Sequence, residues 1–266
     1  MINLSTIITL YKTPLKKQKN LKVYKNYNLH IFEQEGNEIE KKKLSNNLKF
    51  KFKYFYSKKN IGLSKASNFL LKKVQTKYCL FTQADIKIEK KSILRLVSAL
   101  SKNKNIILAT PRLSKKKMIS SKIKYVKNIN AACILFDVRK IKKIGFFDED
   151  YFLYWEDIQF IQKINESGHL MAVVNDAFAQ HDGGKSTKNN YQINRIRSVN
   201  FIYGEFLYDY KQKKLRVLKL FRKFFQNLIL FFFNIFIFQF KRSLMNLSVL
   251  EGIIKFITFY IKKIIL

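Results

Sequence analysis

The sequence predicts an α/β protein in which helices flank a mostly parallel central sheet and a helical appendage follows at the C-terminal end. Over the first two-thirds of the 266 residues, short apolar runs alternate with longer segments of helical periodicity, which is typical of βαβ units. Hydrophobic residues make up 47% of the chain, and it has only 2 Pro and 8 Gly, so it can bury a full core. The composition shifts after about Gly184. We expect one α/β domain over residues 1–204 and a helical, membrane-associating region over 205–266.

Each expected element follows from its local pattern. A helix can start at Pro14, and residues 62–74 carry apolar side chains at helical spacing. Two more helices are expected over 92–100 and 156–167, the second ending at Gly168 in the position that glycine favours after a helix. Residues 33–40 read as an acidic loop. The expected strands are short apolar runs, at 4–10, 28–32, 50–56, 77–81, 106–109, 131–136 and 170–174.

The net charge of +34 indicates a polyanionic partner: nucleic acid, anionic lipid or an anionic ligand. Arg is scarce beside Lys, although Arg is the residue that reads guanines and binds phosphates bidentately, so we expect no nucleic acid. An anionic membrane surface is the favoured partner. The two cysteines, Cys79 and Cys133, suit a reduced compartment, and residues 1–10 lack a basic leader. We therefore expect a cytoplasmic protein, peripheral on the inner face of the plasma membrane.

Residues 224–240 are almost wholly apolar and have basic residues on both sides. Arg222 and Lys223 precede them, and Lys241 and Arg242 follow. This arrangement favours a helix that lies in the membrane interface over one that crosses it. Residues 253–266 form a second apolar stretch. The alternative interpretation is a pair of core helices that pack on the α/β domain.

The acidic residues are few, so their positions are informative. Five of the 18 lie between Asp148 and Asp157, within a frame of aromatic residues. Acids near a helix N-terminus are favoured by the helix dipole, and this explains Glu156 and Asp157 without any chemistry. The aromatic frame favours another interpretation, because carboxylates beside apolar walls have raised pKa values and act as general bases.

Two further side chains are candidates for binding a metal or a phosphate. Asp85 follows the strand at 77–81, and ligands of open α/β sheets bind at the carboxyl ends of the strands. A single carboxylate there suits Mg²⁺ or Mn²⁺, although Asp85 can also be a turn residue. His181 lies in a polar loop with two glycines, where it can bind metal, donate to phosphate or simply face solvent.

Taken together, these segments resemble the bacterial family-2 glycosyltransferases of the GT-A fold, in particular the rhamnosyltransferase-like branch. The resemblance covers about residues 3–204, and the block at 146–157 is its most specific part. It departs from the family at Glu33, where Asp is usual, and at Gln83, the first position of the DxD-like metal motif. The matching blocks are residues 5–11, 60–68, 78–85, 146–157 and 181–186.

The resemblance implies an inverting enzyme that moves a sugar, with rhamnose as one candidate, from a nucleotide-sugar to a cell-surface glycan or lipid-linked acceptor. It implies that Asp157 is the general base and that Glu156 orients the acceptor or the helix. Asp85 and His181 would hold Mg²⁺ or Mn²⁺, and residues 130–132 would line the acceptor side. The donor would contact residues of the first three blocks and the second strand, namely Thr9, Tyr11, Glu33, Asn60, Gly62, Asn68, Gln83 and Asp85.

Two alternatives stay open. A catalytically degenerate partner subunit of a glycan assembly complex would also fit the single carboxylate of the metal motif. A basic nucleic-acid-binding protein is the second. The enzymatic interpretation requires that Asp85 and Asp157, far apart in the chain, reach one cleft.

Overall fold

The computed structural model describes residues 3–113, 121–184, 186–187 and 190–265. The chain divides into two compact units. The sheet unit comprises residues 1–149 and 157–188, and the helical unit comprises 150–156 and 189–266. The boundary differs from the expected one at 204/205, which falls inside a continuous helix. Lys185, in the block matched at 181–186, lies outside the described residues.

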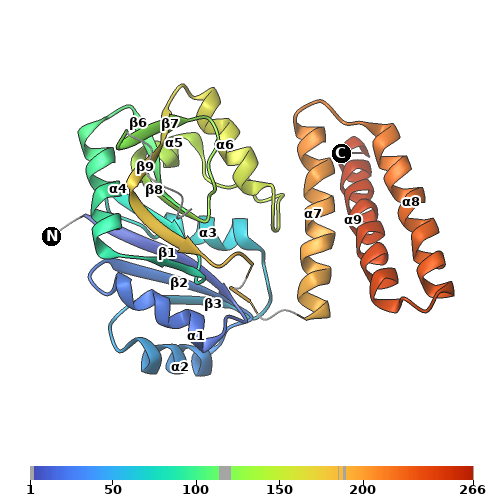
Figure 1. Ribbon diagram of the computed structural model, residues 1–266, viewed down its shortest axis with the longest axis horizontal. Helices are drawn as coiled ribbons and strands as arrows, with labels where there is room; N and C mark the ends of the chain where they lie inside the picture. The colour runs from blue at the N-terminus through green and yellow to red at the C-terminus, as the bar shows by residue number, and fades with distance from the viewer. Residues whose placement is uncertain (1–2, 114–120, 185, 188–189, 266) are drawn as a thin grey trace. The chain divides into compact units, whose positions relative to one another are not determined.

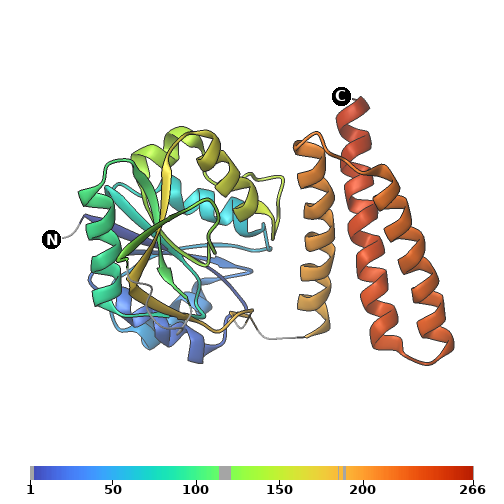
Figure 2. The ribbon, with the colours of Figure 1, turned by 45° about the horizontal axis from the view of Figure 1, so that its top comes forward.

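Within the described residues, nine strands form one sheet at the centre of the sheet unit (Figure 1). Its strands run in the order β3-β2-β1-β4-β8-β6-β9-β5, and β7 pairs with β9 off this path. Figure 2 shows the twist that accumulates across these strands. Their bounds are β1 Leu4–Tyr11, β2 Asn28–Gln34, β3 Lys53–Ser57, β4 Tyr78–Thr82, β5 Ile86–Ile88, β6 Ile106–Arg112, β7 Ile123–Val126, β8 Cys133–Asp137 and β9 Leu170–His181.

The sheet is mixed rather than mostly parallel. Strands β1 to β4 pair in parallel, and so do β6 and β9. Strand β8 lies antiparallel between β4 and β6, and β9 pairs antiparallel with β5 and β7. The difference arises because no helix separates β7 from β8, so the chain makes no crossover before β8 enters the sheet.

Helices cover both faces of the sheet, and alternate residues of the buried strands serve each face. In β4, Leu80 packs in the core shared with α2 and α4, whereas Phe81 packs in the core shared with α3 and α6. The first face carries α1 (Leu15–Gln18), the 3₁₀ helix η1 (Lys19–Tyr24), α2 (Glu38–Leu48) and α4 (Lys90–Lys102). The second carries α3 (Leu63–Lys72), α5 (Val138–Ile144) and α6 (Glu156–Glu166).

The expected acidic loop at 33–40 was wrong. Strand β2 continues to Gln34, and α2 starts at Glu38. The side chain of Asn37 caps α2 by accepting a hydrogen bond from the Glu40 backbone N–H at 2.9 Å. The sequence of α2 is so polar that only Leu44 and Leu48 are buried, so its helical periodicity is weak.

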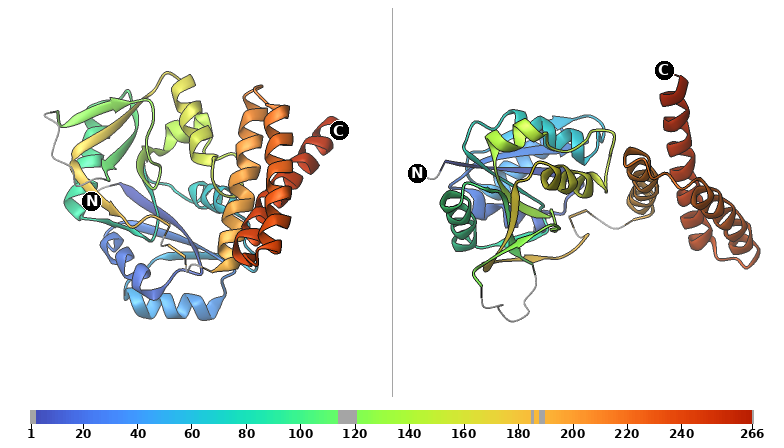
Figure 3. Two further views of the ribbon diagram at one scale, coloured as in Figure 1. Left: turned by 45° about the vertical axis from the view of Figure 1, so that its right-hand side comes forward. Right: turned by 90° about the horizontal axis from the view of Figure 1, so that it is seen from above.

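The helical unit consists of α7 (Tyr191–Lys211), α8 (Val217–Phe236) and α9 (Phe240–Ile265), shown from two sides in Figure 3. Helix α9 packs against both α7 and α8. The apolar segment at 224–240 is therefore not one helix: it ends α8, passes Phe238 in the left-handed region (φ 55°) and begins α9. Within the described residues, one helix is long and apolar enough to cross a membrane, and it is α9 over Phe240–Ile264.

Residues 150–156 pack on α7 within the helical unit. The Trp155 indole donates to the Phe201 carbonyl at 2.9 Å, and its ring lies over Gly204. A Cβ at Gly204 would lie 2.7 Å from Trp155 Cδ1, closer than side chains pack.

We predict that Gly204→Ala lowers the free energy of unfolding by about 1–3 kcal/mol, because the added methyl overpacks this contact. In a helix without such a contact, the same change would raise stability by up to about 1 kcal/mol. Denaturant unfolding measures the difference, with the exposed α7 variant Gln192→Ala as the control. A Gly204→Ala variant more stable than the wild type would contradict the close packing.

Candidate active site

Four parallel strands end at one edge of the sheet. In the strand register, Tyr11 of β1 pairs with Gln34 of β2, and Gln34 pairs with Ser57 of β3. Each of these is the last residue of its strand. The last residue of β4 pairs with the first of β8, so the turn before β8 reaches the same edge. In that turn, Asn130 Oδ1 accepts the Ala132 N–H at 2.9 Å. Ligands of α/β sheets bind at the carboxyl ends of parallel strands, so this edge is the candidate site.

Asp85 and His181 meet at this edge. Asp85 lies three residues beyond β4, and its side chain has no solvent exposure. The pairing of β5 with β9 places Ile86 opposite His181, and the Asp182 N–H donates to the Asp85 carbonyl at 3.2 Å. As a result, His181 Nε2 lies 3.6 Å from Asp85 Oδ2. The structure thus brings together two residues that are 96 positions apart in the sequence.

These two residues fit a divalent metal. Two donors that each lie ~2.1 Å from one ion are separated by about 3–4 Å, which the 3.6 Å spacing satisfies. His181 Nε2 is buried and makes no hydrogen bond among the described residues, so its position suits ligation. The described residues contain no cluster of three His, Cys, Asp or Glu side chains. The remaining ligands of a bound ion would therefore come from substrate and water, as Mg²⁺ prefers.

A set of polar contacts from α1 and η1 holds this loop. Lys17 donates to Asp182, and Lys87 Nζ lies 3.8 Å from the same carboxylate. The ion pair with Lys17 lowers the pKa of Asp182. Asn20 donates to the Ala84 carbonyl at 2.8 Å, next to Asp85. Sequence reasoning missed Lys17 and Asn20, because nothing distinguishes them locally in a chain so rich in Lys and Asn.

Gln34 holds the turn that precedes α3. Its side chain donates to the Gly62 carbonyl and accepts the Ile61 N–H, both at 2.8 Å. Asn60 Oδ1 accepts the Gly62 N–H at 3.0 Å, and Gly62 has a φ of 89°, which favours glycine. Farther along α3, Ser67 Oγ lies 3.5 Å from Thr9 Oγ1 of β1. Asn60, Gly62 and Thr9 are therefore brought to the same edge, and Gln34 is a further member that the sequence did not single out.

Glu33 faces away from this turn. In β2, Phe32 and Gln34 point toward α3, so Glu33 points toward α2 with Ile31. Glu33 is 7% exposed, and burial, with a smaller contribution from Glu40, raises its pKa to about 7. The expected contact between Glu33 and a nucleotide base is not supported by this position, because strand alternation assigns that face to Gln34.

Of the other expected donor contacts, Tyr11 and Gln83 lie at the edge. The Tyr11 hydroxyl donates to Glu35 Oε1 at 3.2 Å, and Gln83 is half-buried between β4 and Asp85. Asn68 has a different role. Its amide donates to the Phe147 carbonyl at 2.8 Å and accepts the Phe147 N–H at 3.2 Å. Asn68 therefore anchors the segment that leads to Asp157, and Glu149 accepts a further bond from it at 3.0 Å.

An aromatic cluster joins β4 to α6. The Phe147 ring lies 5.3 Å from Phe81 of β4 and 5.5 Å from Phe160 of α6, measured between ring centroids. Asp85 lies four residues after Phe81, and Asp157 lies three residues before Phe160. The cluster thus brings the elements that carry the two carboxylates to one part of the sheet unit. Asp157 Oδ1 accepts the Ile158 N–H at 2.9 Å, and burial raises the pKa of Asp157.

Glu156 belongs to the helical unit, where it is 5% exposed. The two residues before it, Tyr154 and Trp155, both have left-handed backbone angles, with φ of 67° and 71°. Two consecutive bulky residues in this region are strained, and such strain is commonly found at functional sites. The Trp155 ring contacts Phe201 and Tyr208, which hold the strained turn in place.

The architecture is a GT-A-like fold, and comparisons with known proteins agree with it. Residues 37–158 match the family model described as "Glycosyl transferase family 2". A mannosyltransferase from Pyrobaculum calidifontis, solved with GDP-Man and Mn²⁺, superposes with a TM-score of 0.59 at 12% identity. That comparison covers 78% of this chain and 64% of the other.

Two further structures are similar. GalNAc-T7, solved with UDP, GalNAc and Mn²⁺, gives a TM-score of 0.53 at 13% identity, over 77% of this chain and 47% of the other. Residues 1–349 of TarS from S. aureus give 0.50 at 14% identity, over 75% and 65%. The matches thus span less than two-thirds of the length of these structures, and their low identities show the fold alone. No curated protein matches the chain in sequence.

We predict that Glu33→Gln changes how stability depends on pH. With a folded-state pKa of about 7, Glu33 keeps its proton where the unfolded chain, with a pKa of about 4.3, has lost it. The contribution of Glu33 to stability is therefore present below about pH 4 and is lost as the pH rises through 7. Glu33→Gln should be more stable than the wild type at pH 8, by on the order of 2 kcal/mol, and not at pH 4.

Denaturant unfolding at a series of pH values tests this expectation. The exposed neighbouring variant Glu35→Gln is the matched control and should show no such gain. If the difference between Glu33→Gln and the wild type stays constant from pH 4 to pH 8, then Glu33 ionises normally.

Proposed function

We propose that this protein is a metal-dependent, inverting glycosyltransferase that transfers a sugar from a nucleotide-sugar to a hydroxyl acceptor. The observation that carries the proposal is the Asp85–His181 pair at the carboxyl edge of the sheet, within a GT-A-like fold. The family match over residues 37–158 supports it. Two structurally similar proteins were solved with Mn²⁺ together with a nucleotide or a nucleotide-sugar, which supports the same class of substrate.

Asp85 and His181 would hold Mn²⁺ or Mg²⁺. A bound divalent ion supplies neutralisation of the charge on the donor diphosphate and on the departing nucleotide. Asn20, which binds the Ala84 carbonyl, and the ion pair of Lys17 with Asp182 hold the segments that carry Asp85 and His181 in place. Lys17 and Lys87 both lie beside the Asp182 carboxylate, so these three side chains carry one net positive charge, which favours a bound diphosphate. Gln34 keeps the turn at Asn60–Gly62 in place on the donor side.

Asp157 would act as the general base. It takes the proton from the acceptor hydroxyl, and the oxygen attacks the anomeric carbon of the sugar. The bond from that carbon to the diphosphate oxygen breaks, so a nucleoside diphosphate leaves and the anomeric configuration inverts. Burial raises the pKa of Asp157, which makes its carboxylate a stronger base than an exposed aspartate.

The acceptor class we propose is a cell-surface glycan or a lipid-linked precursor of one, which assigns the protein to polysaccharide biosynthesis. Rhamnose is the first donor sugar to test, because the resemblance of the 146–157 segment is to rhamnosyltransferase-like enzymes. Ala131 and Ala132, both buried, shape the turn before β8 on the acceptor side.

We predict that Asp157→Asn lowers the transfer rate about 10²–10⁴-fold and leaves donor affinity unchanged, because the amide cannot accept the proton. Transfer by the wild type should fall as the pH drops through the Asp157 pKa, which lies above the ordinary value for aspartate. Nucleotide release, measured across a panel of nucleotide-sugars, gives both the transfer rate of the variant and the pH dependence of the wild type. Glu166→Gln, at the opposite end of α6, is the control. Near-normal turnover by Asp157→Asn would refute the base assignment.

The two-residue metal site keeps a second candidate function open, that of a non-catalytic partner subunit in a glycan assembly complex. The same panel separates the two functions. A wild-type protein that binds a donor but releases no nucleotide with any acceptor would be the non-catalytic subunit.

We predict that donor binding depends on Mn²⁺ through Asp85 and His181. A donor at about 100 times its dissociation constant should add ~2.7 kcal/mol to the stability of the wild type in Mn²⁺, and clearly less in EDTA. Asp85→Asn and His181→Ala should lose the Mn²⁺-dependent part, whereas Asp176→Asn should keep it. Thermal shift with dTDP-, UDP- and GDP-sugars measures these differences. A donor shift of equal size in EDTA would exclude the proposed metal site.

A further inference from the structure

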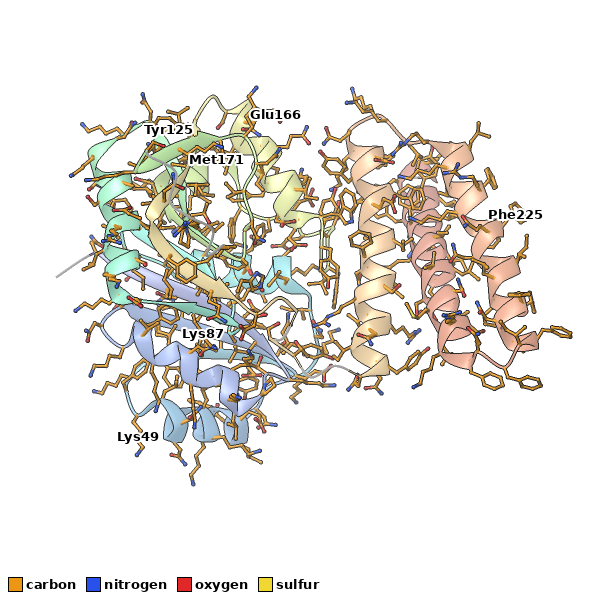
Figure 4. All side chains as sticks on the ribbon, viewed as in Figure 1. Lys49, Lys87, Tyr125, Glu166, Met171 and Phe225 are labelled. Carbon is orange, nitrogen blue, oxygen red and sulfur yellow. The ribbon has the colours of Figure 1, made fainter. Side chains whose placement is uncertain are left out.

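The outward face of α8 is apolar. Its six most regularly spaced outward side chains recur every three or four residues, and each is more than half exposed. Figure 4 shows one of them, Phe225, pointing away from α7 and α9. The six are Leu218, Phe221, Phe225, Ile229, Phe232 and Phe236, which we call the α8 stripe.

The inward face of α8 carries polar groups beside the buried Leu220 and the partly buried Phe224. Asn246 of α9 donates to Asn227 Oδ1 and accepts from Asn234 Nδ2, both at 3.0 Å, so three asparagines form a ladder between α8 and α9. Asn234 is 6% exposed. Toward α7, Lys219 and Lys223 of α8 both pair with Glu205 at 2.6 Å. Polar groups of this helix therefore lie between the helices, next to the apolar core of the helical unit.

A surface helix usually turns its apolar side to the core and its polar side to water. Helix α8 instead exposes an apolar stripe and places Asn and Lys side chains between the helices. In lipid there is no hydrophobic drive between helices, and Asn and Ser side chains hold helices together by hydrogen bonds. Small residues also allow close approach there. In α9, a Cβ at Gly252 would lie 2.6 Å from the Val199 carbonyl of α7, and Ser243 and Ser248 are buried.

The turn between α8 and α9 continues the apolar surface, and basic residues border it. Phe238 is 80% exposed and Phe240 is 57% exposed. Lys241 and Arg242 follow immediately, and Arg222 lies beside the α8 stripe. Residues 189–266 contain only three acids, Glu205, Asp209 and Glu251, and all three are paired with Lys or Arg inside the helical unit. The charge that remains at the border of the apolar surface is positive, which complements anionic headgroups.

We infer that the α8 stripe and the α8–α9 turn dock in the plane of an anionic lipid bilayer, with the aromatic side chains in the acyl region and Arg222, Lys241 and Arg242 among the headgroups. An in-plane position is favoured over a spanning hairpin because Lys241 and Arg242, at the start of α9, would have to cross the hydrocarbon in a spanning hairpin. The inference rests on the helical unit alone and holds whether or not the sheet unit transfers sugar.

The test is co-flotation of the full chain with vesicles of phosphatidylcholine alone and of phosphatidylcholine with phosphatidylglycerol at about three to one. The wild type should bind the anionic vesicles at least about 10-fold more strongly, because each basic residue near an anionic surface adds ~1 kcal/mol of attraction. The triple variant F225S/F232S/F236S should lose about 10-fold or more of this binding, since each phenylalanine contributes apolar area. The matched control is L15S/I39S/L94S, which changes three exposed apolar residues of the sheet unit and should bind as the wild type does.

The positions changed in the triple variant and in the labelled variants, Phe225, Phe232, Phe236 and Leu94, are all exposed. These variants should therefore have the melting temperature of the wild type, which circular dichroism verifies. Anionic vesicle binding by a folded F225S/F232S/F236S that equals the wild type would overturn the inference. So would a lipid-free wild type that is a dimer by light scattering while the triple variant is a monomer with unchanged vesicle binding, because a second copy would then cover the stripe.

A fluorescent label on the α8 stripe distinguishes an in-plane helix from a spanning hairpin. The environment-sensitive fluorophore NBD on Phe236→Cys or Phe225→Cys should shift to the blue on anionic vesicles, whereas NBD on Leu94→Cys should not. Spin labels placed shallow in the acyl chains should quench both stripe positions more than deep ones do. Deeper quenching at 236 than at 225 would indicate a spanning hairpin and contradict the in-plane position.

Discussion

The candidate site depends on the aromatic contact that joins β4 to α6. Phe81 follows from the β4 strand, Phe160 follows from the α6 helix, and Phe147 fills the space between them. Asn68 holds the Phe147 backbone by two hydrogen bonds from α3. Because close-packed aromatic side chains move little, the end of β4 keeps a constant position relative to the first turn of α6. Asp85 follows the end of β4, and Asp157 lies in that first turn.

The charged side chains of the candidate site suit the diphosphate donor that we propose. Asp85 is fully buried beside His181, and the neighbouring Asp182 is already paired with Lys17. The chain is strongly basic as a whole, yet it places Asp85 and Asp182 next to each other at this edge of the sheet. A metal-binding carboxylate in a positive environment can attract a diphosphate and an ion together, which is the requirement of the proposed reaction.

The helical unit differs from the sheet unit in where its apolar and polar side chains lie. In the sheet unit, apolar side chains lie inside and lysines lie outside, as expected in water. In α8 the asparagines and ion pairs lie inward beside Leu220 and Phe224, whereas the α8 stripe faces outward. A sheet unit with a polar surface and a helical unit with an exposed apolar stripe would suit the proposed transfer to a lipid-linked acceptor.

Much of the sheet unit was predictable from sequence, because strong local patterns specify it. The buried runs gave β1, β4 and β8, helical spacing gave α3 and α4, and the placement of Asp85 after β4 indicated a ligand edge. Local patterns did not predict the elements whose structure depends on tertiary contacts. Helix α2 is too polar to show a buried face, the antiparallel entry of β8 depends on its partners, and Phe238 splits the apolar segment at 224–240 into two helices.

The sequence by itself determined the classes of residue available: a carboxylate after a strand, a histidine in a glycine loop, and an acidic–aromatic block before a helix. Only the tertiary structure decided that His181 reaches Asp85, that Gln34 rather than Glu33 faces the Asn60–Gly62 turn, and that the polar side of α8 lies inward. The physical reason is the same in each case. Pairing register and helix rotation set which way a side chain points, and both are fixed by partners that are distant in the chain.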